Sequence, residues 1–359
     1  MQYEYWLAAI REVSDHKKMQ LRKMYKSAKE LYYIEETELK TLYFLDVNDL
    51  KYISESKKTW CLEKEYESLC EKGIALVLFH DQVYPEKLKV ISAPPYALYI
   101  KGQLPAAECF TAGIVGARRC SHYGETMARE IAGQLAANGV SIISGLARGI
   151  DGAAGRGALE AGGISYAVLG SGADICYPAE HIGLYMDLQK RGGIITEQPP
   201  GVPPMAYNFP ARNRIISGLA DAVIIIEAKT RSGSLITADM AMEQGKEVYA
   251  LPGPVNSALS SGCNALIKQG AGIFISVEDF MQDVKIIYER NVKIPTKNEI
   301  KLESAENLVY SCLDLFPKSL NMILAETKLS ITALMNTLVT LELGGYIEEV
   351  SKNYYVKTK

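Results

Sequence analysis

A regular alternation of short apolar runs and helix-like segments, from about Gly73 to Asp279, constrains the fold of this chain more than any other feature. Helical patterns such as 124–138 and 234–244 separate the runs. Near-continuous apolar strands that alternate with helices are typical of a parallel sheet covered on both faces. The sequence therefore predicts an α/β domain with a mainly parallel sheet, with strands at 111–115, 140–143, 164–169, 193–196, 222–226 and 247–251.

The segments on either side of this region have a different texture. The first 60 residues have helical spacing and contain no glycine, which predicts a small helical domain. A charged stretch with Pro295 reads as a linker. The tail reads as three helices and a hairpin, the layout of a winged helix. We expect a helical domain at 1–65, the α/β domain at 66–284, a linker at 285–301 and a winged helix at 302–359.

Composition and charge exclude several classes of protein. Hydrophobic residues make up 48% and charged residues 23%, as in ordinary globular proteins. No apolar run approaches the roughly 18 residues of a membrane helix, and the first residues lack the layout of a secretory signal. We expect a cytoplasmic protein with no membrane partner. The net charge of −3 argues against a globally basic binder but leaves room for a local basic site.

The sequence contains no recognisable motif for binding a metal or a cofactor. The seven cysteines form no C-x-x-C pair, and only four histidines are present, so spacing predicts no metal site. A P-loop, a G-x-S-x-G elbow and a G-x-G-x-x-G fingerprint are all missing from the sequence. No carboxylate pair stands out as a candidate for acid–base catalysis. We therefore expect no catalytic residues and no cofactor.

Four segments at the predicted strand ends combine small residues with arginine. Glycines let backbone N–H groups approach an anion, helix N-termini favour negative charge, and arginine adds bidentate phosphate contacts. For any one segment, a tight turn, a helix cap or a core position is an equally good explanation. Four such segments at one sheet edge favour a polyanion over a single nucleotide. They are GARRCS (116–121), SGLARGID (144–151), FPARNR (209–214) and KTRSGSLIT (229–237).

The same segments carry motifs that closely resemble the DNA-processing protein A family, also called DprA or Smf. The resemblance runs from about Tyr84 to Phe280 and continues more weakly toward both ends. The motifs are SGLARGID (144–151), AVLGSG (167–172), YP (177–178), FPARNR (209–214), RSGSLIT (231–237), LPG (251–253) and GCNALIKQGA (262–271).

This resemblance implies an extended Rossmann-like core between a SAM-like helical domain and a winged helix. It implies a protein that binds incoming single-stranded DNA in natural transformation, protects it and helps to load RecA recombinase. Homodimers form through the core in this family, and no enzymatic activity is ascribed to it. The candidate DNA-binding residues are Arg118, Ser121, Ser144, Gly145, Arg148, Gly149, Phe209, Arg212, Asn213, Arg214, Arg231, Ser232 and Gly233.

Two positions depart from the family pattern. Gly155 stands where many members have histidine, so any role of that side chain is absent here. Residues 205–208 contain no basic residue, although relatives often have one there. Other arginines would have to supply the missing contact.

Two other functions remain open from the sequence. Phosphoribohydrolases of the LOG type share a related core and use a P-G-G-x-G-T-x-x-E loop. The matching stretch, 231–239, keeps one glycine and ends in Asp239. A protein-interaction scaffold is the third possibility, and it predicts no oligonucleotide binding at physiological salt.

Both ends of the chain have ambiguous roles. The third helix of the tail, at 330–343, has Glu342 as its only charge. Phosphate contacts dominate DNA affinity, so this pattern favours protein contact or dimer support over duplex reading, while Lys352, Lys357 and Lys359 remain candidates for a backbone contact. Five basic residues near the N-terminus fit either a DNA contact or a solvated helix face. They are Lys17, Lys18, Arg22, Lys23 and Lys26.

Overall fold

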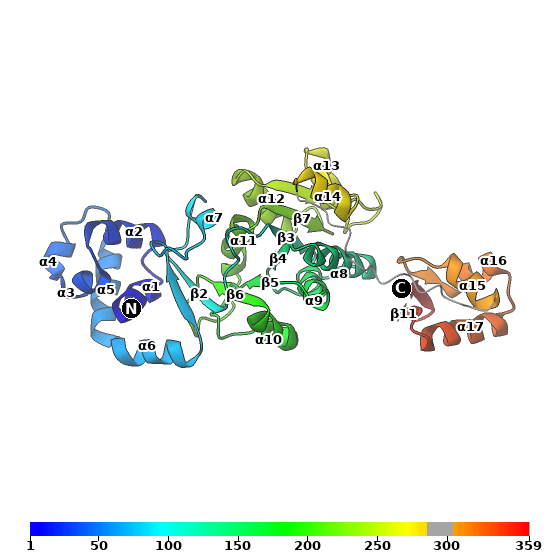
Figure 1. Ribbon diagram of the computed structural model, residues 1–359, viewed down its shortest axis with the longest axis horizontal. Coiled ribbons are helices and arrows are strands. Elements are labelled where there is room, and N and C mark those ends of the chain that lie inside the picture. The colour runs from blue at the N-terminus through cyan, green and yellow to red at the C-terminus, as the bar shows by residue number, and fades with distance from the viewer. Residues whose placement is uncertain (286–303, 359) are drawn as a thin grey trace. The chain divides into compact units, whose positions relative to one another are not determined.

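The computed structural model describes residues 1–285 and 304–358 (Figure 1). Contacts divide the chain into two compact units, Met1–Arg119 with Met127–Tyr288 and Cys120–Thr126 with Glu289–Lys359. Each unit contains a hydrophobic core of its own. The domain borders expected from the sequence stay predictions, and the predicted linker at 285–301 lies outside the described residues except for Lys285.

Six helices form the N-terminal part of the first unit. Capping side chains set where several of them begin, as at Asp46, whose carboxylate accepts a hydrogen bond from the N–H of Asp49 at 3.0 Å. Ser14 and Ser27 cap their helices in the same way. The helices are α1 (Gln2–Ala9), α2 (Asp15–Met24), α3 (Ala28–Tyr33), α4 (Glu36–Leu39), α5 (Val47–Thr59) and α6 (Leu62–Glu71).

A nine-stranded sheet forms the centre of the first unit, in the order β1-β2-β6-β5-β4-β3-β7-β8-β9. The neighbouring strands β6, β5, β4, β3, β7, β8 and β9 pair in parallel. The pairs β1–β2 and β2–β6 are antiparallel. The mainly parallel sheet is confirmed. The strands are β1 (Ala75–Leu78), β2 (Ala97–Gly102), β3 (Thr111–Gly116), β4 (Ser141–Ser144), β5 (Ser165–Val168), β6 (Gly192–Thr196), β7 (Ala222–Ile226), β8 (Glu247–Ala250) and β9 (Gly272–Ile273).

Three strands of the sheet, β1, β2 and β9, were not predicted from the sequence. β1 and β9 are the two edges of the sheet, and β2 lies between β1 and β6. Helices and one 3₁₀ turn connect the strands. These are α7 (Glu86–Lys89), α8 (His122–Ala137), α9 (Ile150–Glu160), η1 (Ala179–His181), α10 (Ile182–Lys190), α11 (Asn208–Leu219), α12 (Gly233–Glu243), α13 (Ser261–Lys268) and α14 (Val277–Asp283).

Both faces of the sheet are covered, because successive side chains of a strand point to opposite faces. In β2, Leu98 and Ile100 belong to one core cluster, whereas Tyr99 belongs to the other. The cluster that contains Tyr99 also contains Trp6 and other residues of the N-terminal helices. The helical region therefore shares a core with the sheet and does not have a separate one.

The strand order places a crevice between β3 and β7. From β3 the chain builds the sheet toward β6 in one direction, and β7 then returns to the other side of β3. Ligands of open parallel sheets bind at such a reversal, beyond the carboxyl ends of the strands. The N–H of Ala117 donates to the carbonyl oxygen of Glu227 at 2.8 Å, so the two strands stay paired up to the loops that follow them.

The described residues of the second unit include three helices and a three-stranded sheet, ordered β10-β12-β11. This order of elements is the one expected of a winged helix, and the assignment stays a prediction. Among the described residues, no single helix is both long and apolar enough to cross a membrane; α16 and α17 pass that test only as a pair bent by 112°. The elements are α15 (Ser304–Cys312), β10 (Lys318–Ser319), α16 (Leu320–Thr327), α17 (Ile331–Leu343), β11 (Ile347–Ser351) and β12 (Tyr354–Lys357).

Trp6 provides a test of the shared core. Its side chain is fully buried, and its Nε1 donates to the Ser56 hydroxyl at 2.9 Å. Trp6→Ala should lower the free energy of unfolding by about 3–5 kcal/mol, because it leaves a large cavity. Tyr43→Ala, at a side chain that is 95% exposed, is the matched control and should change it by less than about 0.5 kcal/mol. Urea unfolding of the full chain measures both, and a small loss for Trp6→Ala would contradict the shared core.

Candidate nucleic-acid interface

A cavity of about 560 Å³ opens at the crevice between β3 and β7. The loops after these two strands form two of its walls, and the first turns of α11 and α12 complete it. Asp151 is the only acidic residue among the described residues that line it. The basic and aromatic residues of the lining are Arg118, Arg119, Tyr177, Phe209, Arg212, Lys229 and Arg231.

Two further cavities share lining residues with this one. A small cavity of about 30 Å³ shares Arg118, Tyr177 and Phe209 with it and adds Arg148. A cavity of about 490 Å³ shares Arg231 and the start of α12 with it. The three cavities together are called the groove below. Shared linings make the groove an elongated site, which suits a chain better than a compact ligand.

Aromatic rings and a guanidinium group meet in the groove. The rings of Phe209 and Tyr177 lie 5.6 Å apart between centroids, and the Arg118 guanidinium lies 5.1 Å from the centre of the Phe209 ring. Tyr177 is 42% exposed, and Phe209 is half-buried. Each ring therefore keeps surface on which a planar group can stack.

Five cationic side chains of the groove are exposed to solvent. Arg148 is the one with a strong partner: its Nε and Nη2 donate to the two carboxylate oxygens of Glu180 at 2.6 and 2.8 Å. These hydrogen bonds raise the pKa of Arg148 and lower that of Glu180. A polyanion must therefore compete with Glu180 for Arg148. The exposed cations are Arg118, Arg119, Arg148, Lys229 and Arg231.

Asp151 ties the loops of the groove together from below. Its carboxylate is buried and accepts the N–H of Gly145 at 3.0 Å, along with the amides of Gly116 and Ala147. Burial raises its pKa, although the charge of Arg212 and these three amides act in the opposite direction. The sequence analysis left a simple helix cap open for Asp151; the structure gives it the larger task of holding two loops.

Arg212 departs from the sequence expectation. It is 4% exposed, and its Nη1 donates to the carbonyl oxygens of Gly145, at 2.9 Å, and Val168. Burial lowers the pKa of Arg212 to about 10, Asp151 raises it and Arg118 lowers it. The guanidinium therefore bonds the interior of the protein, and the role of Arg212 as a DNA contact stays a prediction.

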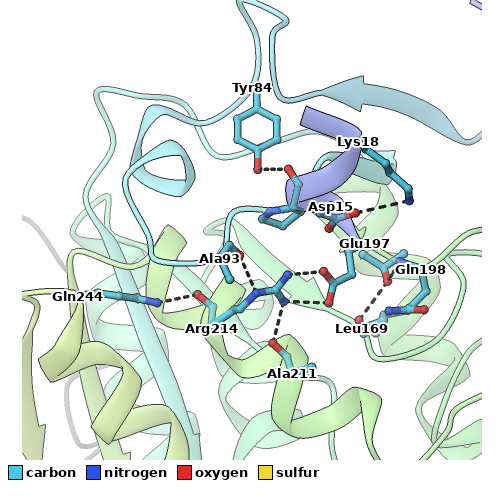
Figure 2. A network of polar contacts seen from close by, with 12 residues as sticks. Asp15, Lys18, Tyr84, Ala93, Leu169, Glu197, Gln198, Ala211, Arg214 and Gln244 are labelled. Atoms are coloured by element: carbon cyan, nitrogen blue, oxygen red, sulfur yellow. Dashed lines mark hydrogen bonds and ion pairs between the residues drawn. The ribbon is translucent and has the colours of Figure 1, made fainter. Parts of the chain in front are cut away.

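Arg214 also lies in an internal ion pair. Its Nη1 and Nη2 donate to the carboxylate of Glu197 at 2.9 and 2.5 Å, and its Nε donates to the carbonyl oxygen of Ala93 at 2.8 Å (Figure 2). Its side chain is 17% exposed, and Arg214 does not line the groove. Its role as a DNA contact stays a prediction, which its internal partners do not favour.

The positions of the Arg212 and Arg214 side chains follow from the fact that FPARNR lies in a helix. The sequence analysis treated the motif as a loop before a helix, whereas α11 begins at Asn208. Successive residues of a helix are about 100° apart around its axis. Phe209 and Asn213 therefore reach the groove, Arg212 lines it from a buried position, and Arg214 points away from it.

The SGLARG loop presents fewer free amides than expected. The Ser144 hydroxyl donates to the carbonyl oxygen of Ile114 at 2.6 Å, and the Gly145 N–H is bonded to Asp151. A Cβ at Gly145 would lie 2.6 Å from both Asp151 and Arg212. Gly149 has a φ of 71° and lies against the backbone of Arg118, where only glycine fits. These three residues shape the groove from behind.

The remaining candidates lie in or near the groove. Asn213 lines it and donates through Nδ2 to the carbonyl oxygen of Gly233 at 3.3 Å. Ser232 caps α12 at the edge shared by two of the cavities. Ser121 lies outside the three cavities; its hydroxyl accepts the N–H of Gly124 at 3.1 Å, in the first turn of α8.

Sequence reasoning missed three residues of the groove. Arg119 and Lys229 stood in the quoted loops but were not chosen, although both follow strands that end at the crevice. Tyr177 was noted only as part of a motif. Its ring reaches Phe209 because Tyr177 lies in the turn after β5, which the strand order brings to the same edge.

The basic cluster near the N-terminus is mostly paired inside the protein. Lys17 bonds the carboxylates of Asp46 and Asp49, at 2.9 and 2.5 Å. Lys18 is buried, and Arg22 pairs with Glu4 at 3.1 Å. In the part of the chain that the structure describes, no group of His, Cys, Asp and Glu side chains is arranged to hold a metal ion.

The fold and the groove define a Rossmann-like protein with an elongated basic site. A model of the family described as DNA recombination-mediator protein A matches residues 75–285. The protein Smf of Escherichia coli (strain K12) is 39% identical over 287 residues, covering 78% of this chain and 76% of that protein. The DNA processing protein DprA of Streptococcus pneumoniae (strain ATCC BAA-255 / R6) is 41% identical over 222 residues, covering 62% and 77%.

Solved structures agree with the sequence comparison. The X-ray structure of DNA processing protein A (DprA) from Streptococcus pneumoniae matches with a TM-score of 0.70 at 31% identity, covering 80% of this chain and 99% of that one. The structure that describes the single-stranded DNA binding mode of DNA processing protein A from Helicobacter pylori matches with a TM-score of 0.53 at 27% identity, covering 59% and 95%. The chain belongs to the DNA recombination-mediator protein A family, and the resemblance noted in its motifs is confirmed.

Asp151 should be essential to the stability of the groove. Asp151→Ala should lower the free energy of unfolding by about 3–5 kcal/mol, because it leaves the Arg212 charge buried without its counter-charge. Asp239→Ala, at an exposed position of α12, should change it by less than about 0.5 kcal/mol. Urea unfolding of the two variants side by side measures this. A loss below about 1 kcal/mol for Asp151→Ala would contradict the assigned role.

Proposed function

We propose that this chain binds single-stranded DNA in the groove, without catalysis, as a recombination mediator. The observation that carries the proposal is the meeting of exposed cations and two accessible rings at one edge of the sheet. Cations track the phosphates of a flexible strand, while rings stack on bases whatever their identity. Rings stack only on bases that are unpaired, so the groove favours single strands over duplex.

The proposed contacts are of three chemical kinds. Arg118 and Arg231 offer phosphate contacts from the loops after β3 and β7. Phe209 offers a stacking surface, with Tyr177 beside it. Asn213 of α11 adds a polar group, as do Ser232 and Gly233 at the start of α12. Ser144, Gly145 and Gly149 support the groove from behind and are not proposed as contacts.

The proposal of a non-catalytic role rests on the acidic residues. Asp151 is buried among amides and faces Arg212. Asp239, which stands at the glutamate position of the phosphoribohydrolase loop, is exposed on α12 and lines only the third cavity. No other carboxylate lines the groove among the described residues. The hydrolase alternative therefore has no general base beside the rings.

Family membership supports the wider role. We propose that the chain protects incoming DNA in natural transformation, helps to load RecA onto it and works as a homodimer in the cytoplasm. Binding of single-stranded DNA is described for the Helicobacter pylori relative. The RecA surface and the dimer interface are proposed on family membership alone.

Fluorescence anisotropy with labelled oligo-dT across a salt series tests the proposal directly. The full chain should bind oligo-dT more tightly than duplex. Arg118→Ala should lower both the affinity and the logarithmic salt slope, the slope by about 0.7, because one phosphate contact is lost. Phe209→Ala should weaken binding by about 1–3 kcal/mol with little change in slope, because stacking releases no counterion.

A matched control is available elsewhere in the same unit. Lys64→Ala removes an exposed cation of α6, outside the groove, and should leave both quantities unchanged. Equal slopes for Arg118→Ala and the unchanged chain would count against the groove. Release of free base from nucleoside monophosphates would support the hydrolase instead.

Glu180 offers a test with the opposite sign. Its carboxylate holds Arg148 at 2.6 Å, so DNA must displace it before Arg148 can meet a phosphate. Glu180→Gln should therefore tighten binding to oligo-dT by a few-fold, because the exposed ion pair that competes with DNA is weak. Glu160→Gln, which removes the exposed partner of Arg129, is the control and should not tighten binding. Weaker binding by Glu180→Gln would show that Arg148 is held in its binding position by the pair.

A further inference from the structure

An ion pair lies outside the groove, on the part of α11 that faces the N-terminal helices. Arg214 of α11 and Glu197, which follows β6, are joined by two hydrogen bonds at 2.9 and 2.5 Å, with side chains 17% and 12% exposed. Figure 2 shows Asp15 and Lys18 of α2 beside this pair. Burial opposes the charge of Arg214, but Glu197, Asp15 and Tyr84 outweigh it and raise its pKa.

The backbone around the pair is held in place on both sides. Arg214 also bonds the carbonyl oxygens of Ala93 and Ala211, each at 2.8 Å. The Gln244 side chain of the next helix donates to the carbonyl oxygen of Arg214 at 3.2 Å. The hydroxyl of Thr196, the residue before Glu197, donates to the carbonyl oxygen of Ser171 at 2.9 Å. The pair therefore joins α11 to the end of β6 and to the segment before β2.

Lys18 connects this cluster to the N-terminal helices. It is 3% exposed, its Nζ donates to the carbonyl oxygen of Ala8 at 2.9 Å, and it lies 3.5 Å from the carboxylate of Asp15. Burial lowers its pKa, while Asp15, Glu197 and Glu12 raise it. The charge of Lys18 thus has Glu197 among its few compensating neighbours, so α2 and the Glu197–Arg214 pair stabilise each other.

The turns of α11 beside Arg214 present the groove residues. Phe209 and Asn213 line the groove from the first turns of α11, and Arg214 follows Asn213 directly. Asn208 fixes the start of the helix through a bond from Nδ2 to the carbonyl oxygen of Gly170 at 2.9 Å. A rotation or shift of α11 at Arg214 would therefore move the Phe209 ring relative to Tyr177 and Arg118.

We propose that the Glu197–Arg214 pair, with Asp15 and Lys18 beside it, is a positioning device that couples the N-terminal helices to the groove. Arg214 acts through α11 and does not contact DNA. This inference rests on the proposed function. The unchanged chain must bind oligo-dT for it to be tested, so failure of the function is seen first and separately.

Binding of oligo-dT across a salt series distinguishes positioning from contact. Arg214→Met and Glu197→Gln should each weaken binding about 2- to 30-fold, the range of coupling through packed elements. Both should leave the salt slope unchanged, whereas Arg118→Ala lowers it by about 0.7. A slope that falls by the same amount in Arg214→Met would show a phosphate contact and overturn the proposal.

Conservative variants separate positioning from loss of the fold. Arg214→Lys and Glu197→Asp keep both charges in a buried pair and should recover most of the affinity. Circular dichroism and thermal unfolding define a temperature at which each variant is fully folded, and binding is compared there. If Arg214→Met and Glu197→Gln bind as tightly as the unchanged chain while folded, the pair serves stability alone and the proposal is wrong.

A double-mutant cycle tests the link to the N-terminal helices. Lys18→Met should weaken oligo-dT binding without a change in slope, and its effect should be smaller when Glu197→Gln is already present, because coupled residues are not additive. Lys23→Met, an exposed position of the same helix, is the control and should have no effect. If the effects of Lys18→Met and Glu197→Gln simply multiply, α2 is not coupled to the groove.

Discussion

The groove depends on one buried carboxylate. Asp151 accepts amides from Gly116, Gly145 and Ala147, and thereby ties the loop after β3 to the loop after β4. Arg212 enters the same place from α11 and balances the charge, while its guanidinium bonds two carbonyl oxygens. A buried charge is tolerated only when it is paired and fully hydrogen-bonded. This one interaction therefore fixes the loop after β3, the loop after β4 and α11. The exposed side chains on these elements are held in place as a result.

The division between interior and exterior arginines explains how a chain with a net charge of −3 can present a basic site. Arg212 and Arg214 neutralise internal carboxylates and build the frame. Arg118 and Arg231 lie in loops at the crevice, where few acidic groups oppose them. Overall charge governs solubility and long-range attraction, whereas local placement governs where a phosphate chain binds. The site is basic because of placement and not because of composition.

Sequence patterns predicted the frame well because burial repeats along the chain. Strand runs such as 222–226 become a strand buried on both faces, and the helical pattern at 234–244 becomes α12 to within one residue at each end. The strands β1, β2 and β9 were not predicted, because β1 and β2 pair antiparallel outside the strand–helix alternation and β9 has only two residues. The family motifs pointed to the right part of the sheet and to Arg118, Phe209 and Arg231.

By itself, the sequence determined the class of fold, the family and the segments that meet at the crevice, because apolar spacing and strand–helix order are local properties. Tertiary structure alone decided which side chain of each segment faces outward. In FPARNR the helix turns Phe209 and Asn213 to the groove, buries Arg212 against Asp151 and pairs Arg214 with Glu197. The motif shows that these residues matter together. Only the three-dimensional placement of Asp151 and Glu197, far away in sequence, shows that two of the arginines have internal partners while others are exposed in the groove.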